Sequence, residues 1–587
     1  MTRDGSRSWG GGAQAKEERE LTLIFLGVNS NIRGGFRERR GARARPSPPP
    51  LIRPCIDQRI CKVRICFNST NYSIFLPVFM MENQFLPSPI MLLASSLFFI
   101  LALLKIWKIS TSNTPLNLPP GPTKLPVIGN IHQLIGYSPH RRLRYLANQY
   151  GSIMHLQLGQ VMNTVISSPE AAMEVMKTHD IAFAQRPSLS AAVIISYDSS
   201  DIVFAPYSDY WKQVRKLCVQ ELLSTVRVQS FRSIREEEGS KLIHAIASCS
   251  GKPFNFSRKI FSSAYGMVGR AAFGEKCKEQ EEFIPLAEEI ARALGEFNLA
   301  DLFPSFKFLR RFSGISTIER LHKATDRIIE NIINDRRAAK KSLKAEEKGE
   351  ENNLLDVLLR LQEDGDLEIP LTDNKIKAVI SDVFIAGSET SSTAIEWAMS
   401  ELLRNPRVMH KAQEEVRRVY GKKGKVDESE LHQLDYLKLV IKETLRLYPP
   451  APLLLPRQSR ESCKINGYDI PINSHVIINA WAIGRHPNHW KEAEKFHPER
   501  FTDSSVDFKG NSFEFIPFGA GRRMCPGIAF ATANIELSLA QFLYHFDWQL
   551  PNGMKLESLD MAEGFGATMR RKNDLHLIPI LVHSPSY

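Results

Sequence analysis

The sequence predicts one large, mainly α-helical domain that follows a single membrane-spanning helix. Helical spacing of apolar residues dominates after residue 130, and no plausible linker interrupts the chain from there to Tyr587. Before that region, residues 85–104 form a run of 20 uncharged and mostly apolar residues. Such a run is about long enough to cross a bilayer core of roughly 30 Å. The helical region exceeds the usual size of one hydrophobic core, so we expect it to enclose something at its centre.

Most of the positive charge lies in residues 1–80, which we expect to be disordered. They contain 14 Lys and Arg against 6 Asp and Glu, so they account for 8 of the net charge of +12. The rest of the chain carries only +4, which argues against nucleic acid as a partner. Two interpretations of this extension remain open. It is a targeting peptide, which its early acidic residues disfavour, or a translated leader before a second sensible start at Met81.

The uncharged run is predicted to be the membrane helix of an anchor at 81–110. Lys105 and Lys108 follow the run and Glu82 precedes it, and this charge bias places the C-terminal side in the cytosol. A cleaved signal peptide is the alternative, although no small-residue cleavage site follows the run. We expect a proline-rich hinge at 111–130 and a catalytic domain at 131–587, in which the charged run 336–352 is a surface loop.

Cys525 is the cysteine whose surroundings indicate chemistry. The chain has eight cysteines without a CxxC pair, which suits a reducing compartment and leaves any cysteine chemistry to one thiolate acting alone. Cys525 lies in the run PFGAGRRMCPG at 517–527, where three glycines allow a tight loop and a close approach to a flat ligand. A thiolate presented from such a loop can bind iron. An isolated cysteine is more often a buried apolar filler, but the spacing of the run favours the ligand interpretation.

Three further patterns place polar side chains on helices. The segment from Asp373 to Arg404 has helical spacing, begins at a capping acid and is interrupted by Gly, Ser, Glu and Thr at 387–390, which we expect to bend or loosen it. Trp211 and Arg215 lie one helical turn apart and suit a carboxylate partner, with plain core packing as the alternative for the tryptophan. Glu443 and Arg446 share a helix face that ends at two prolines, and such a pair in isolation is usually a weak surface ion pair.

The run at 517–527 resembles the haem-binding loop of cytochrome P450s, and the other patterns follow in that family's order from about Pro119 to the C-terminus. The resemblance implies a mainly α P450 fold with small β regions. It also implies haem b (iron protoporphyrin IX) with Cys525 as the iron ligand. The same resemblance gives haem-contacting roles, including contacts to the propionates, to Phe518, Gly519, Arg523, Gly527, Trp211, Arg215 and Arg457.

Other roles also come from the resemblance alone. The sequence FHPERF at 496–501 is similar to a second family motif, whose Arg500 would complete a buried scaffold with Glu443 and Arg446. Thr390 would donate a hydrogen bond toward dioxygen, and Glu389 would help to supply protons. The expected substrate pocket contains Ala386, Ala451, Leu453 and Leu454, although core packing explains the leucines nearly as well.

The motif forms are most similar to plant microsomal P450s of the branch that oxidises terpenoids and alkaloids. That resemblance implies a monooxygenase in the endoplasmic reticulum membrane, with a cytosolic catalytic domain and a hydrophobic substrate such as a terpenoid. The chain has no dinucleotide fingerprint, so electrons are expected from NADPH through a separate P450 reductase. Two alternatives stay open, namely a P450-fold isomerase or dehydratase that needs no electron donor, and a haem-binding sensor or catalytically silent membrane protein.

Overall fold

The computed structural model describes Leu93, Ser96, Leu97 and Ile100, and then residues 116–274, 280–296, 298–342, 353–421, 423–564 and 566–585. The expected disordered extension at 1–80 and most of the expected anchor at 81–110 lie outside these residues. Among the residues that the structure describes, no helix combines the length and apolar character that a membrane span requires. Residues Asn113–Tyr587 form one structural unit, which contains the proline-rich segment at 116–130 and every motif after it.

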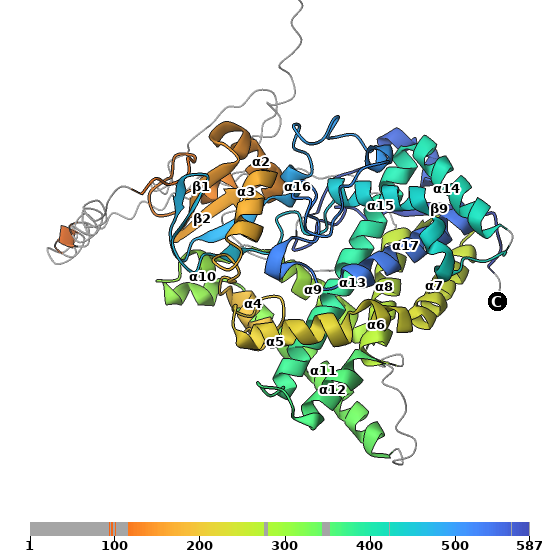
Figure 1. The fold of residues 1–587 in the computed structure, drawn as a ribbon, viewed down its shortest axis with the longest axis horizontal. Coiled ribbons are helices and arrows are strands. Elements are labelled where there is room, and N and C mark those ends of the chain that lie inside the picture. Colours follow the sequence, from red (N-terminus) through yellow and green to blue (C-terminus); the bar gives the residue numbers. More distant parts are fainter. Residues whose placement is uncertain are drawn as a thin grey trace, which may run out of the picture. The chain divides into compact units, whose positions relative to one another are not determined.

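This unit is mainly helical, as the sequence predicts (Figure 1). Short 3-10 and π turns connect many of the helices. The α-helices are α2 (Pro139–Tyr150), α3 (Pro169–Met173), α4 (Ser190–Ile195), α5 (Asp209–Leu217), α6 (Thr225–Ser230), α7 (Arg232–Ala247), α8 (Phe256–Phe273), α9 (Gln280–Gly295), α10 (Leu299–Leu302), α11 (Ile315–Ser342), α12 (Leu354–Asp364), α13 (Asp373–Arg404), α14 (Pro406–Tyr420), α15 (Asp435–Leu447), α16 (Ala480–Ile483) and α17 (Ile528–His545).

The β structure is confined to small sheets, which also agrees with the expected fold. The largest sheet has the strand order β1-β2-β7-β4, in which β2 and β7 run parallel and the other pairs are antiparallel. Two smaller sheets have the orders β3-β9-β8 and β5-β6. The strands are β1 (Ile153–Leu158), β2 (Val161–Ile166), β3 (Phe254–Asn255), β4 (Arg457–Gln458), β5 (Cys463–Ile465), β6 (Tyr468–Ile470), β7 (His475–Ile478), β8 (Phe546–Gln549) and β9 (His576–Leu581).

Helix α13 has the predicted bounds, but the expectation that Asp373 caps it is wrong. Thr372 caps its N-terminus, because the Thr372 side chain, rather than that of Asp373, accepts from the Lys375 amide at 3.4 Å. The helix also continues without a break through 387–390. The hydroxyls of Ser388, Thr390 and Ser392 each donate to the carbonyl four residues earlier, so they are satisfied inside the helix without interrupting it.

Close packing fixes α13 among its neighbours in the main core. A Cβ on Gly269 of α8 would lie 3.3 Å from the Phe384 ring of α13, so the two helices approach closely where that glycine lies. Further along α13, the fully buried indole of Trp397 stacks on the ring of Tyr448, with centroids 4.2 Å apart. Figure 1 shows α13 running through the helical region beside α8 and α17. The element that carries the Glu-Thr pair is therefore rigidly held.

The proline-rich segment at 116–130 is non-helical, as predicted, and it packs against β1. The His155 amide donates to the Pro120 carbonyl at 2.9 Å, and the Gln157 amide donates to the Asn130 side chain at 2.8 Å. A Cβ on Gly121 would lie only 2.1 Å from the His155 carbonyl oxygen, so a glycine is needed at that close approach.

The expectation of a surface loop over 336–352 is wrong for residues 336–342, which form the end of α11, while 343–352 lie outside the described residues. Arg336 donates to the Asp356 carboxylate of α12 at 2.6 Å, and Arg337 pairs with Asp373 at 2.7 Å. These pairs connect the end of α11 to two other helices. The charged run is helical because its arginines have partners across the fold, which no local pattern reveals.

Candidate active site

The loop that presents Cys525 depends on glycine backbone geometry. Gly519 and Gly521 have φ values of 72° and 68°, a region that other residues rarely adopt. A Cβ on Gly521 would also lie 2.1 Å from the Met176 carbonyl oxygen, so a side chain is excluded there on both grounds. The loop ends at Gly527, after which α17 begins at Ile528.

Two backbone hydrogen bonds hold Cys525 in this loop. Its own amide donates to the Phe518 carbonyl at 3.0 Å, and the Gly527 amide donates to its Sγ at 3.4 Å. Burial raises the pKa of the Cys525 thiol, whereas the Gly527 amide and the Arg215 guanidinium lower it. An amide that donates to sulfur stabilises a thiolate, which is the form that binds iron.

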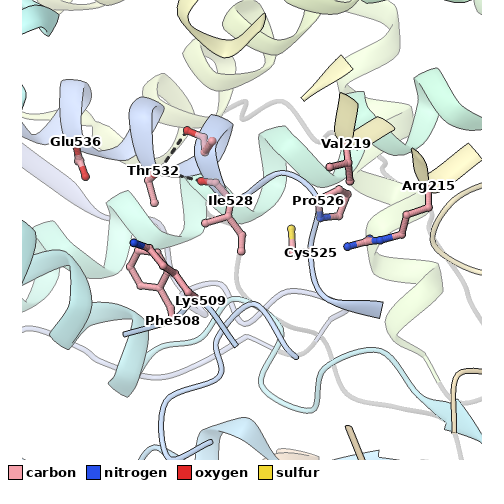
Figure 2. Close-up of a pocket in the computed structure, with 10 residues that line it drawn as sticks. Arg215, Val219, Phe508, Lys509, Cys525, Pro526, Ile528, Thr532 and Glu536 are labelled. Carbon is pink, nitrogen blue, oxygen red and sulfur yellow. Dashed lines mark hydrogen bonds between the residues drawn. The ribbon is translucent and has the colours of Figure 1, made fainter. Parts of the chain in front are cut away.

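Cys525 opens onto a cavity of about 480 Å³ between α5, the cysteine loop and α17 (Figure 2). Arg215 extends toward Cys525 from α5, on the same side as Val219 and Pro526, while Ile528 and Phe508 lie on the other side of the sulfur. The Phe508 ring, which lines the cavity, meets the Phe518 ring edge-on at 5.3 Å between centroids. The cavity is lined by Arg215, Val219, Phe508, Lys509, Cys525, Pro526, Ile528, Ala529, Thr532 and Glu536.

Three buried guanidiniums gather beside the cysteine loop. Arg523 donates to the carbonyls of Ala184 and Ala205 at 2.8 and 2.6 Å. Arg457, on β4, donates to the Ala520 carbonyl at 2.9 Å and lies 3.5 Å from the Asp180 carboxylate. The third is Arg186, which the sequence analysis missed, and its Nε donates to the Val203 carbonyl at 3.0 Å.

The charges of this cluster are incompletely balanced. Burial lowers the pKa of Arg457 to about 10 and that of Arg523 to about 9, with repulsion from Arg457 adding to the effect at Arg523. Burial also lowers the pKa of Arg186 well below its usual range, followed by repulsion from Arg523 and Arg457. Most of the acceptors around them are neutral carbonyls. Such a cluster favours a bound anion, and the two propionate carboxylates of haem supply that charge, so the residues fit the group.

Trp211 differs from its expected role. Its indole Nε1 donates to the Ile202 carbonyl at 3.0 Å, and the Arg523 guanidinium lies 4.0 Å from its ring centroid. The indole N–H is therefore already used in a hydrogen bond to the backbone. The buried ring supports the guanidinium cluster and is not a free donor. Arg215, one turn further along α5, lines the cavity onto which Cys525 opens.

Glu389 and Thr390 are adjacent on α13 but face different surroundings. The Glu389 side chain is buried, accepts from the Tyr265 hydroxyl at 2.6 Å and pairs with Arg570. The Thr390 hydroxyl is partly exposed and donates to the carbonyl of Ala386 at 2.8 Å, and Ala386 itself is exposed. The Thr390 oxygen still has lone pairs that can accept a hydrogen bond from a ligand. Glu389 is held by Tyr265 and Arg570, which lie far from it in the sequence and could not be predicted as its partners.

The three predicted pocket residues before Arg457 are partly exposed. Leu453 packs against a core cluster next to β1, and Leu454 packs against the cluster beneath the cysteine loop. Leu454 has a φ of 50°, and a Cβ on Gly519 would lie 3.8 Å from its Cδ1. The leucines therefore contribute to packing, and Ala451, which precedes them, is half-buried.

Glu443, Arg446 and Arg500 meet in one buried network. Arg446 donates to both Glu443 carboxylate oxygens at 2.7 and 2.8 Å, and Arg500 donates to the same carboxylate at 2.9 Å. The Glu443 and Arg446 side chains are fully buried. Arg446 also donates to the Gly484 carbonyl at 2.6 Å, so the network connects α15 to the segment after α16.

Comparison with known proteins agrees with this fold. The cytochrome P450 family model matches residues 119–578, so the chain belongs to the cytochrome P450 family and is one of its monooxygenases. It is 54% identical over 501 residues to Cytochrome P450 71D10 of Glycine max, covering 84% of this chain and 98% of that protein. It is 56% identical over 471 residues to tabersonine 16-hydroxylase 2 of Catharanthus roseus, covering 79% and 92%. A solved zebra fish cytochrome P450 with progesterone has the same fold at a TM-score of 0.65 and 24% identity, covering 76% of this chain and 100% of that one.

Replacing Glu443 with Gln should destabilise the fold strongly, because Arg446 would remain buried without its carboxylate. Removing one partner of a buried ion pair costs about 3–5 kcal/mol. We expect a lower midpoint of thermal unfolding and a lower yield of haem-containing protein. Glu430→Gln, which removes a more exposed pair with Lys423, is the matched control and should leave the midpoint unchanged. Equal midpoints for both variants would show that the network does not stabilise the fold.

Proposed function

We propose that this chain inserts one atom of dioxygen into a hydrophobic small molecule, using electrons from NADPH delivered by a separate P450 reductase. The observation that carries the proposal is the position of Cys525. Its sulfur accepts from the Gly527 amide and opens onto a cavity that Arg215 also lines. A plant specialised metabolite such as a terpenoid is the proposed substrate class. The exposed apolar side chain of Ala386 on α13 and the named hydroxylase among the relatives support it.

The chain's own residues would hold haem b at three places. Cys525 would bind the iron, and Phe518 and Gly519 would pack against the ring from the loop. Arg215, Arg457 and Arg523 would face the propionates, whose negative charge relieves the repulsion among the guanidiniums. When the haem iron is bound by a cysteine thiolate, the thiolate supplies electron density that favours O–O cleavage.

Thr390 and Glu389 would control protons beside that site. Thr390 Oγ1 already donates to the Ala386 carbonyl, so its lone pairs can accept a hydrogen bond from a water molecule and hold that water beside α13. Glu389 is held by Tyr265 and Arg570, and it can pass a proton only when one of these contacts opens. The proposed division of work gives Thr390 the contact with oxygen and Glu389 the supply from the protein side.

The site of action that we propose is the cytosolic face of the endoplasmic reticulum, with residues 81–110 as a single-pass anchor. The uncharged run at 85–104 and the lysines after it support this arrangement. Protein that begins at Met81 should keep its activity and membrane association, and deletion of residues 81–107 should weaken membrane binding. Subcellular fractionation measures both. If loss of 1–80 alone moved the protein to the cytosol, the extension would be a targeting element.

The proposed reaction can be tested with the anchored protein, P450 reductase, NADPH and a panel of terpenoid and phenolic compounds under labelled dioxygen. We expect a product that carries one labelled oxygen atom and forms only with NADPH. The reduced protein with carbon monoxide should show the red-shifted Soret band of a thiolate-ligated haem, and Cys525→Ala should lack that band or the haem. A product that forms equally without NADPH would indicate the isomerase or dehydratase alternative instead.

Thr390→Ala should lower the ratio of oxidised product to NADPH consumed and release more hydrogen peroxide, because a positioned proton donor is lost. Haem content and the carbon monoxide spectrum should survive. Ser392→Ala is the matched control, since it removes another hydroxyl that donates back along α13, at 2.6 Å to Ser388. More than one substrate must be tried, because a substrate hydroxyl can replace the missing group. If the ratio of product to NADPH fell equally in both variants, the effect would come from a disturbed helix and not from the Thr390 hydroxyl.

A further inference from the structure

The loop at 201–205, between α4 and α5, holds the guanidinium cluster through its backbone. Its carbonyls accept from the cluster residues. The Ile202 carbonyl accepts from Trp211, the Val203 carbonyl accepts from Arg186, and the Ala205 carbonyl accepts from Arg523 at 2.6 Å. The position of this loop therefore determines where these donors point.

The other side of the same loop is held by a carboxylate of α13. One oxygen of Asp382, Oδ2, accepts from the backbone amides of Ile202 and Val203 at 3.0 and 3.2 Å. The two residues whose amides bind Asp382 are thus the residues whose carbonyls accept from Trp211 and Arg186. One peptide unit joins the two sides directly: the Val203 amide donates to Asp382, and the Ile202 carbonyl of the same unit accepts from the Trp211 indole. In the next unit the Val203 carbonyl accepts from Arg186, and the Phe204 amide donates to Asp201.

A second acid, Asp201, belongs to the loop itself and accepts a hydrogen bond from the loop's own backbone. Asp201 is fully buried and accepts from the Phe204 amide with both oxygens at 3.0 Å. Its charge also attracts the Arg186 and Arg523 guanidiniums. Asp201 shapes the loop, whereas Asp382 attaches the loop to α13. Ala386, one helical turn after Asp382 and on the same face, is exposed, so the attachment lies next to the open part of the helix.

We propose that Asp382 is a positioning residue for haem binding: through loop 201–205 it holds Arg186 and Arg523 in place for the haem carboxylates, with Trp211 as their buried support. Asp382 itself does not contact the haem in this arrangement. It acts by fixing the Ile202 and Val203 amides, and thereby the loop whose carbonyls accept from three side chains in separate parts of the sequence. This role concerns retention and orientation of haem, so it does not depend on the substrate, the reductase or the oxygen insertion proposed above.

Asp382→Asn tests this role with little change in shape, because a neutral amide oxygen is a weaker acceptor than a carboxylate oxygen. Two readouts are needed in the full-length holoprotein. Hydrogen–deuterium exchange of peptides covering 196–208 should become faster, and transfer of haem to excess apomyoglobin should speed up about tenfold, the effect of one weakened charge-assisted hydrogen bond. Asp373→Asn, on the same helix but paired with Arg337, is the matched control and should change neither readout.

A haem analogue separates positioning from general destabilisation. Wild-type and Asp382→Asn protein are reconstituted with haem dimethyl ester, which lacks the two carboxylates. If Asp382 acts through the guanidiniums, the tenfold difference in haem transfer between the two proteins should fall to near one with the ester. A difference that persists with the ester, or faster haem loss without faster exchange of 196–208, would overturn the proposal. Unchanged exchange and transfer in Asp382→Asn with ordinary haem would overturn it as well.

Discussion

Burial of positive charge beside the cysteine loop is the constraint on which the site depends. Burial lowers the pKa values of Arg186, Arg457 and Arg523, and repulsion from neighbouring arginines lowers those of Arg186 and Arg523 further. The fold meets this cost with backbone carbonyls from distant segments and with the Asp180 carboxylate beside Arg457. These contacts hold the segment before α4, the loop before α5 and the start of the cysteine loop together. The remaining imbalance of charge suits an anionic ligand.

The two arginine networks described above differ in how directly their guanidiniums contact a carboxylate. Around Glu443, a fully buried carboxylate accepts from Arg446 at 2.7 Å and from Arg500 at 2.9 Å, and the remaining donors reach carbonyls. These direct contacts suit a scaffold. In the cluster beside Cys525, Arg457 lies 3.5 Å from Asp180, and Arg186 and Arg523 donate to backbone carbonyls, an arrangement that suits an anionic ligand.

Local sequence rules were sufficient for some features and failed for others. The bounds of α13 and the need for glycine in the cysteine loop follow from spacing and backbone conformation, and both could be predicted. The roles of Arg186 and Asp382 could not, because their partners are backbone groups of loop 201–205, far from Asp382 in sequence. The helical end of α11 was missed for the same reason, since its arginines pair with Asp356 and Asp373 across the fold.

Helix α13 carries three acids at seven-residue spacing, which lie on one face because seven residues are close to two turns. Asp382 binds loop 201–205, Glu389 binds Tyr265 and Arg570, and Glu396 binds the Ser257 hydroxyl and the Arg571 amide. Three attachments along one face fix the rotation of the helix about its axis. Thr390 follows Glu389 directly, so its side chain is turned roughly 100° away from that face. The partners of the acids thereby set the direction in which Thr390 points.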